Sequence, residues 1–383
     1  MDKSKLEGRR SALTRMRLPA SPISRRGFVR GATAAAGLAT IGGFARHAKA
    51  TTSIKYLGWQ GYDAAITPDY LKAKDLALET TYISDSAEII TKVQLGQGQY
   101  DLCTPYFIYV DFQARQGTLE PIDLAKVPNY DKTFPFIKQM QGLVVDGQQY
   151  AVPLTFGSMP LMYNAKEIAT APTSWMDLFK PEFKGKVAIV NDINAVMVVW
   201  TRVATGAKVG TQATRDELKK TVELLIKLKK EQLRTICTSY GELVDLMGRG
   251  EVTIAQGWEP VAAWVGDKVE IKWTRPKEGT LTFVDCYGIA KGAPELEIDH
   301  ALLNEVLSVE GQVALATANT MPVVNADAVA KLDDFNRGYY PYDKIESYFS
   351  EGGSIDPMYY IEDDGIHATW DEYHEAWEQV LKA

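Results

Sequence analysis

Apolar and polar positions alternate with a strand period at three places early in the chain. Residues 52–57 and 78–83 are rich in β-branched and aromatic side chains, and residues 100–103 form a shorter run of the same kind. A helical pattern follows Ser86, where the aliphatic residues within 89–93 share one side. This order of strands and helices predicts an α/β fold built on a mostly parallel sheet.

Two capping boxes predict the starts of helices further along the chain. In each, a threonine stands three residues before a glutamate: Thr214 before Glu217, and Thr369 before Glu372. Apolar residues at helical spacing follow both boxes. We interpret both helices as packing elements rather than as binding features.

Two extended segments divide the chain into two predicted lobes. With 383 residues the chain exceeds the size at which single cores stop growing, about 250–300 residues. Residues 151–157 and 283–290 are β-like runs that we expect to cross between lobes. We therefore predict one lobe from residues 51–153 plus 286–383, and a second lobe from residues 154–285.

Charge is distributed unevenly between the first fifty residues and the rest. The formal net charge is -7, yet residues 1–50 contain eleven Lys and Arg against two acids. The remainder is therefore strongly acidic, which excludes nucleic-acid binding by bulk positive charge. Composition is otherwise that of a globular protein, 46% hydrophobic and 24% charged.

The basic segment has the order of an export signal. Arg25 and Arg26 precede a weakly apolar run, which ends in the small-x-small pattern at Ala48 to Ala50 that a signal peptidase cuts. This resembles a bacterial twin-arginine signal peptide. The resemblance implies a periplasmic protein whose signal is removed near Ala50.

The sequence contains none of the residue patterns that mark a catalytic or metal centre. His300, His367 and His374 form no ligand cluster with Cys or Asp, and neither a nucleophile elbow nor a phosphate loop is present. We expect no enzyme activity, no metal and no cofactor. The chain has three cysteines, Cys103, Cys237 and Cys286, which allow at most one disulfide. Their spacing does not decide whether it forms.

Aromatic residues and acids follow several predicted strands. They are Trp59 and Tyr62 after the first strand, Tyr106 and Phe107 after the third, and Trp258 and Glu259 after residues 252–256. Because ligands of open α/β sheets bind beyond the carboxyl ends of strands, these side chains are expected to meet in one cleft. Ring faces and carboxylates together suit an organic cation.

Several motifs of the chain resemble those of the periplasmic solute-binding components of polyamine-type ABC importers. The segment 174–185, with its pattern Ser-Trp-x-Asp-Leu-x-x-Pro-x-x-x-Gly, is the most specific of them. Others are residues 58–62, 99–102, 151–157, 247–252 and 276–279. The resemblance implies the two-lobed periplasmic binding protein fold (type II), with a hinge, a ligand cleft and a permease partner in the inner membrane.

The resemblance also implies which residues touch the ligand. Trp59 and Tyr62 match a pair that sandwiches the chain of spermidine or putrescine, and Asp285 matches an acid that grips a terminal amine. Further matches are the ring of Trp258, Asp192 as the first of two acids, Phe283 where a tryptophan is usual and Tyr106 where a serine is usual.

Two departures weaken the match to long polyamines. Ala195 stands where the second acid is expected, and Met321 stands where a tyrosine is common. Because an unpaired buried ammonium costs several kcal/mol, the loss of an acid argues against long polyamines. A shorter amine, an amino acid derivative or another amine-bearing solute stays open. Glu259 is a candidate to supply the missing charge.

Other ligand classes stay open at this point. An anionic solute requires cations in the cleft, for which Arg202, Arg234 and Arg275 are the candidates. A ferric ion requires adjacent tyrosines, and the chain has such pairs at 339–340 and 359–360. An exported enzyme is a third alternative.

Overall fold

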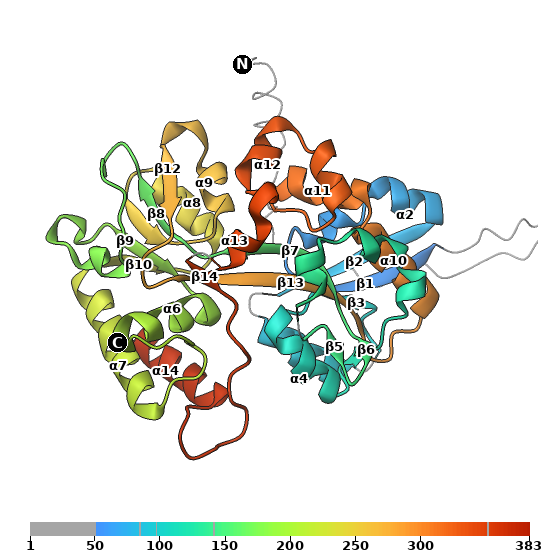
Figure 1. Ribbon diagram of the computed structural model, residues 1–383, viewed down its shortest axis with the longest axis horizontal. Coiled ribbons are helices and arrows are strands. Elements are labelled where there is room, and N and C mark those ends of the chain that lie inside the picture. Colours follow the sequence, from blue (N-terminus) through green and yellow to red (C-terminus); the bar gives the residue numbers. More distant parts are fainter. Residues whose placement is uncertain (1–50, 84–85, 97, 141, 351) are drawn as a thin grey trace, which may run out of the picture. The chain divides into compact units, whose positions relative to one another are not determined.

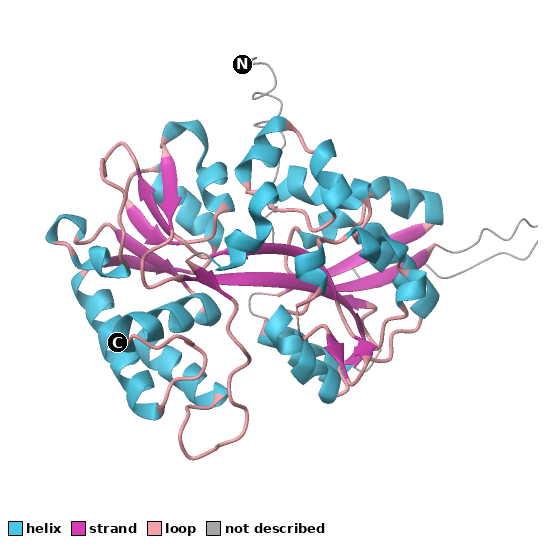
Figure 2. Cartoon of the chain, in the orientation of Figure 1, coloured by secondary structure: helices cyan, strands magenta, loops and turns pink. Residues whose placement is uncertain are grey.

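The computed structural model describes residues 51–83, 86–96, 98–140, 142–350 and 352–383. The basic segment 1–50 lies outside the described residues, so the twin-arginine signal and the cleavage near Ala50 stay predictions. Figure 1 shows the described chain coloured along the sequence, and Figure 2 shows its helices and strands.

The first sheet contains the strands that the early alternation predicts. Strand β1 (Thr52–Gly58) pairs in parallel with β2 (Leu76–Tyr82) and with β3 (Leu102–Cys103). Strand β13 (Thr280–Ala290) pairs with β3, β4 (Leu119–Glu120) and β7 (Val152–Ser158) in antiparallel fashion and with β14 (Gly353–Ser354) in parallel. The predicted α/β arrangement is confirmed, since parallel strands alternate here with helices.

The second sheet has the strand order β10-β9-β11-β8-β12. The first three strands are parallel, and β8 runs antiparallel to both of its neighbours. The strands of this sheet are β8 (Leu161–Asn164), β9 (Val187–Val190), β10 (Leu233–Cys237), β11 (Ile254–Gln256) and β12 (Ile271–Thr274). A separate hairpin joins β5 (Val144–Val145) to β6 (Gln148–Gln149).

Strands β7 and β13 run side by side between the two groups of elements (Figure 1). Their register pairs Ser158 with Thr282 at one end and Val152 with Tyr287 at the other. All side chains of both strands are buried. The two segments predicted to cross between lobes are thus paired strands, while their action as a hinge stays a prediction.

The helices surround the two sheets (Figure 2). Around the first sheet lie α2 (Pro68–Lys74), α3 (Ala87–Gly96), α4 (Val110–Arg115), α5 (Pro135–Lys138), α10 (Leu296–Val306) and α11 (Val309–Asn319). Around the second lie α6 (Ile193–Thr205), α7 (Arg215–Glu231), α8 (Tyr240–Gly248), α9 (Pro260–Val265) and α14 (Trp370–Lys382). Between the two groups of elements lie α12 (Asp334–Tyr339) and α13 (Ile345–Ser350). No helix in the described ranges is both long and apolar enough to cross a membrane.

Both predicted capping boxes are present. The Thr214 side chain accepts from the Glu217 backbone N–H at the start of α7, and Thr369 does the same for Glu372 at the start of α14. Helix α14 also contacts α7, because Lys229 Nζ donates to the carbonyl oxygens of Val380 and Leu381. The C-terminal helix therefore packs on the helices of the second sheet.

Candidate functional site

A cavity of about 370 Å³ opens where strands of both sheets end. Many of the residues that line it lie at or just beyond the carboxyl ends of β1, β9, β10 and β11, which is where an open α/β sheet binds ligands, and others lie on β13. The lining residues are Trp59, Gln60, Tyr62, Ile83, Ser86, Tyr106, Met159, Val190, Asn191, Asp192, Asn194, Cys237, Thr238, Ser239, Tyr240, Gly241, Trp258, Trp264, Leu281, Phe283, Asp285, Asn319 and Met321.

Two glycines allow the aromatic side chains to reach this cavity. Gly61 has a φ of 95°, in the left-handed region, and turns the chain from β1 into the short helix η1 (Tyr62–Ala65). Gly157 on β7 is paired with Phe283, and a Cβ atom there would lie 2.4 Å from the Phe283 ring. The absence of that Cβ leaves room for the rings of Phe283 and Trp258.

Asp285 is the deepest carboxylate of the cavity. Asp285 is only 6% exposed, and its carboxylate accepts a hydrogen bond from the Tyr62 hydroxyl. Burial raises the pKa of Asp285 to about 7, although the Tyr62 hydrogen bond lowers it and the nearby charge of Asp192 raises it further. A cation placed against this carboxylate favours its ionised form, so the site is suited to an ammonium group.

Asp192 is held at the start of α6. One carboxylate oxygen accepts from the Ala195 backbone N–H at 3.1 Å, which caps the helix, and the other accepts from the Tyr240 hydroxyl at 3.3 Å. Asn194 in the first turn of the same helix accepts from the hydroxyls of Tyr109 and Tyr359. The start of α6 is therefore fixed by hydrogen bonds from several elements.

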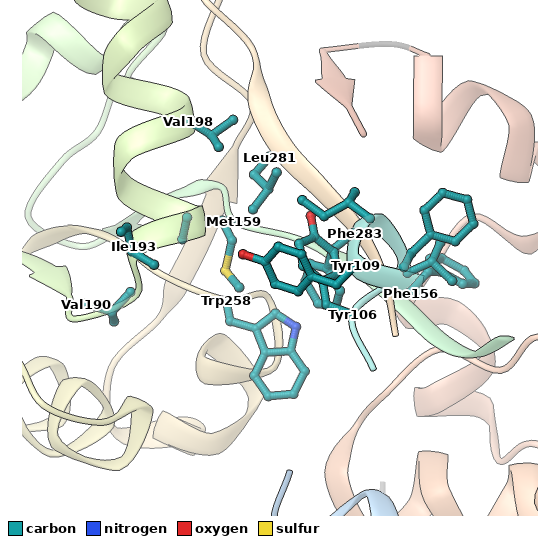
Figure 3. Close-up of a cluster of buried hydrophobic side chains, with 14 of the residues drawn as sticks. Tyr106, Tyr109, Phe156, Met159, Val190, Ile193, Val198, Trp258, Leu281 and Phe283 are labelled. Carbon is teal, nitrogen blue, oxygen red and sulfur yellow. The ribbon is translucent and has the colours of Figure 1, made fainter. Parts of the chain in front are cut away.

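Aromatic rings form the walls of the cavity. The ring centroid of Trp258 lies 5.5 Å from Tyr240, 5.4 Å from Trp264 and 6.4 Å from Phe283. Figure 3 shows Trp258 and Phe283 gathered with Met159 and Tyr106. Trp59 and Tyr62, which follow β1 of the first sheet, also line the cavity.

The predicted site residues are brought together with one exception. Trp59, Tyr62, Tyr106, Asp192, Trp258, Phe283 and Asp285 all line the cavity. Met321, whose position was predicted from the resemblance, lines it as well. Whether these side chains contact a ligand stays a prediction.

Glu259 is the exception, since it is fully buried away from the cavity lining. Its carboxylate accepts from the Tyr348 hydroxyl at 2.7 and 2.8 Å and from the Ser158 backbone N–H at 2.9 Å. Burial raises the pKa of Glu259, while these hydrogen bonds and the charge of Arg275 lower it. The structure therefore corrects the prediction that this acid supplies charge to the ligand.

Several lining residues were missed from the sequence. Tyr240 directly follows Ser239, whose side chain caps α8 just after β10, so the rule about strand ends would have found it. Trp264 lies in the last turn of α9, where no motif marks it. Asn194 and Asn319 also carry no sequence signal.

The alternatives for other ligands find no support at the cavity. Arg202, Arg234 and Arg275 are absent from the lining, and the side chains of the first two pair with Asp356 and Glu251. Neither tyrosine pair, 339–340 or 359–360, lines the cavity. Among the described residues, no group of three or more His, Cys, Asp or Glu side chains is arranged to hold a metal ion, and the three cysteines are unpaired.

Comparison with protein families matches residues 65–337 to the family described as bacterial extracellular solute-binding protein. The match covers more than half of the chain. The chain belongs to this family. The prediction of a solute-binding protein is thereby confirmed.

Individual relatives agree with the family. The chain is 25% identical over 304 residues to the spermidine/putrescine-binding periplasmic protein of Escherichia coli, covering 77% of this chain and 84% of that one. It is 24% identical over 312 residues to the putrescine-binding periplasmic protein SpuD of Pseudomonas aeruginosa, covering 75% and 83%.

A solved structure shows the same fold. The Tp0655 (TpPotD) lipoprotein of Treponema pallidum superposes with a TM-score of 0.71 at 19% identity, covering 86% of this chain and 99% of that one. The predicted fold class, the α/β fold of periplasmic binding proteins, is confirmed.

Proposed function

We propose that this solute-binding protein serves an ABC importer by capturing a small organic amine such as putrescine or spermidine. One observation carries the proposal: Asp192 and Asp285 line a cavity walled by aromatic rings. The described lining residues include no Lys or Arg. The cavity therefore favours a positively charged solute over an anion.

The chemistry of an amine fits these groups. An ammonium group leaving water needs a charged partner, because its unpaired burial costs several kcal/mol. Asp285 supplies that partner in the deepest part of the cavity, and the Tyr62 hydroxyl orients it. The faces of Trp59 and Trp258 offer apolar contact to methylene groups and attraction to cations.

The relatives support the same class of ligand. The Escherichia coli relative is named for spermidine and putrescine, and the Pseudomonas aeruginosa relative for putrescine. We extend to this chain the location and partner that these names imply. It would act in the periplasm after removal of its twin-arginine signal and would deliver its solute to an inner-membrane permease, without catalysis or a cofactor.

Capture by closure of two lobes is part of the proposal. We propose that residues 51–153 and the later part of the chain form one lobe, that residues 154–285 form the other, and that β7 and β13 act as the hinge. We include α14 in the second lobe, which changes the predicted boundary at that point; the hydrogen bonds of Lys229 to Val380 and Leu381 support this choice.

Calorimetric titration of the purified protein tests the ligand class. Putrescine and spermidine are expected to bind with micromolar or tighter dissociation constants. Succinate, a dianion with a four-carbon chain, serves as the charge-reversed control and is expected not to bind. The absence of binding by either amine would overturn the proposal, whether or not succinate binds.

A further inference from the structure

The side chain of Asn194 is held at the wall of the cavity by two tyrosines. Its carbonyl oxygen Oδ1 accepts from the Tyr109 hydroxyl at 2.9 Å and from the Tyr359 hydroxyl at 3.1 Å. Tyr109 belongs to the short helix η2 (Phe107–Tyr109), whereas Tyr359 lies between β14 and α14. All three residues are 7% exposed or less. Two distant parts of the chain therefore set the orientation of this one amide group.

The amide nitrogen of Asn194 is left to face the cavity. Because both hydroxyls donate to Oδ1, the Nδ2 atom on the other arm of the amide points away from them. Asn194 lines the cavity, and among the described residues its Nδ2 atom has no hydrogen-bond partner. Buried polar groups of proteins are nearly always paired, so this donor is placed to meet an acceptor that enters the cavity.

A second donor of the same kind is the hydroxyl of Tyr106. The Tyr106 ring packs edge-on against Tyr109, with ring centroids 5.6 Å apart, and Figure 3 shows the two rings together. Tyr106 lines the cavity and is 4% exposed, and its hydroxyl has no hydrogen-bond partner in the described part of the chain. Burial raises the pKa of Tyr106 well above its usual value, so the hydroxyl keeps its proton. Two neutral donors, connected through Tyr109, thus line the cavity.

The charges around these donors disfavour an anionic acceptor. Asp192, two positions before Asn194, lines the same cavity, as does Asp285. The charges of both acids also raise the pKa of Tyr106, which indicates that they lie near its hydroxyl. No Lys or Arg among the described lining residues could balance a third negative charge. An acceptor that meets Asn194 is therefore expected to be neutral, such as an ether, hydroxyl or carbonyl oxygen.

We propose that Asn194 and Tyr106 form a subsite for a neutral hydrogen-bond acceptor, so that the preferred solute is an amine that also carries an ether, hydroxyl or carbonyl oxygen. The inference rests on the proposed function, in which carboxylates hold the ammonium group, and it names the substrate class more narrowly. A simple diamine leaves both donors without a partner, because an ammonium group donates hydrogen bonds and accepts none. An oxygen on the solute pairs with them.

The test compares two amines of equal length and charge that differ at one position of the chain. 4-Methoxybutylamine has an ether oxygen, which can only accept, where hexylamine has a methylene group. The measured quantity is the affinity for 4-methoxybutylamine divided by that for hexylamine, both obtained by calorimetry. This ratio cancels any effect that a variant has on the ammonium group alone.

Two variants of nearly unchanged shape remove the donors one at a time. Asn194→Asp keeps an oxygen for both tyrosines and replaces the N–H donor by an acceptor, whereas Tyr106→Phe keeps the ring and removes the hydroxyl. In each, the ratio is expected to fall about 2- to 12-fold below that of wild type, which is the net worth of one hydrogen bond.

Asn304→Asp is the matched control, since it makes the same chemical change away from the cavity. Its Oδ1 atom accepts from the Asn129 backbone N–H at 2.8 Å, and the ratio is expected to stay that of wild type. If wild type binds both monoamines and Asn194→Asp leaves the ratio unchanged, or if wild type binds putrescine and neither monoamine, the acceptor subsite is wrong while the proposed function stands. If wild type binds neither the monoamines nor putrescine, the proposed function itself fails.

Discussion

The hydroxyl of Tyr62 donates a hydrogen bond to the carboxylate of Asp285, 223 positions later in the sequence. Burial raises the pKa of Tyr62 well above its usual value, so the hydroxyl keeps its proton and acts as the donor. The same bond lowers the pKa of Asp285 against the effect of burial. This pair joins the turn after β1 to β13 at the deepest point of the cavity.

Replacing the Asp285 carboxylate is expected to remove most of the affinity for amines. In Asp285→Asn the shape is kept but the charge partner is lost, and such a loss costs about 2–5 kcal/mol, or roughly 30-fold and more in affinity. Calorimetry with putrescine measures it. Asp146→Asn, which changes an exposed acid, is the matched control, and equal affinities of the two variants would contradict the role of Asp285.

The affinity for amines is expected to rise with pH. The empty site binds a proton at Asp285 with a pKa of about 7, and a bound ammonium group favours the ionised form. Affinity should therefore increase from pH 6 to pH 8, then level off, with release of a proton on binding. The buffer takes up the released proton, so the measured binding enthalpy should differ between phosphate and Tris buffers. A binding enthalpy that is the same in both buffers at pH 7 would argue against proton release.

Tyr62→Phe is expected to shift the rise of amine affinity to higher pH. Without the donor, the pKa of Asp285 rises further because burial acts unopposed by that hydrogen bond. Putrescine affinity should then fall more at pH 7 than at pH 8.5. An equal loss at both values would indicate that Tyr62 acts through packing alone.

A second buried acid, Asp299 on α10, predicts a pH dependence of stability. Burial raises its pKa to about 8, with further contributions from Asp101 and Glu295. Because the folded pKa lies above the unfolded one, the protonated form stabilises the fold at low pH, and this stability is lost as pH rises toward 8. Asp299→Asn removes that loss. The free energy of unfolding, measured with urea, should therefore differ less between pH 6 and pH 9 in this variant than in wild type. An unchanged difference would contradict the assignment.

The buried ion pair of Arg202 and Asp356 is expected to matter more for stability than an exposed one. Both side chains are about 5% exposed or less, and Asp356 also accepts from the backbone N–H groups of Gly210 and Thr211. Removing one partner of a buried pair costs about 3–5 kcal/mol. Asp356→Ala should therefore lower the free energy of unfolding far more than Asp363→Ala, which breaks the exposed pair with Arg215. Similar losses would contradict this ranking.

Local patterns predicted the elements that depend on neighbours in the sequence. The alternation in residues 52–57 corresponds to β1, and the boxes at Thr214 and Thr369 start α7 and α14. The rule about strand ends, combined with the resemblance, selected cavity residues from distant parts of the chain, among them Trp59 and Asp285. These predictions hold because a strand's period, a helix cap and a strand end are set within a few residues.

The contrast between Trp258 and Glu259 shows what only the tertiary structure decided. The two residues are adjacent in the sequence, yet Trp258 lines the cavity, whereas Glu259 is buried against Ser158 and Tyr348. Trp264 on α9 also lines the cavity, and the backbone oxygen of Glu259, just before that helix, accepts from the Tyr339 hydroxyl. The sequence by itself, through its strand ends and its resemblance to a known family, indicated the solute-binding class and selected Asp285 among the residues that line the cavity. Which neighbouring side chains face the cavity depended on the packing of α9, α12 and α13 around Glu259, and contacts between residues about a hundred positions apart leave no local pattern.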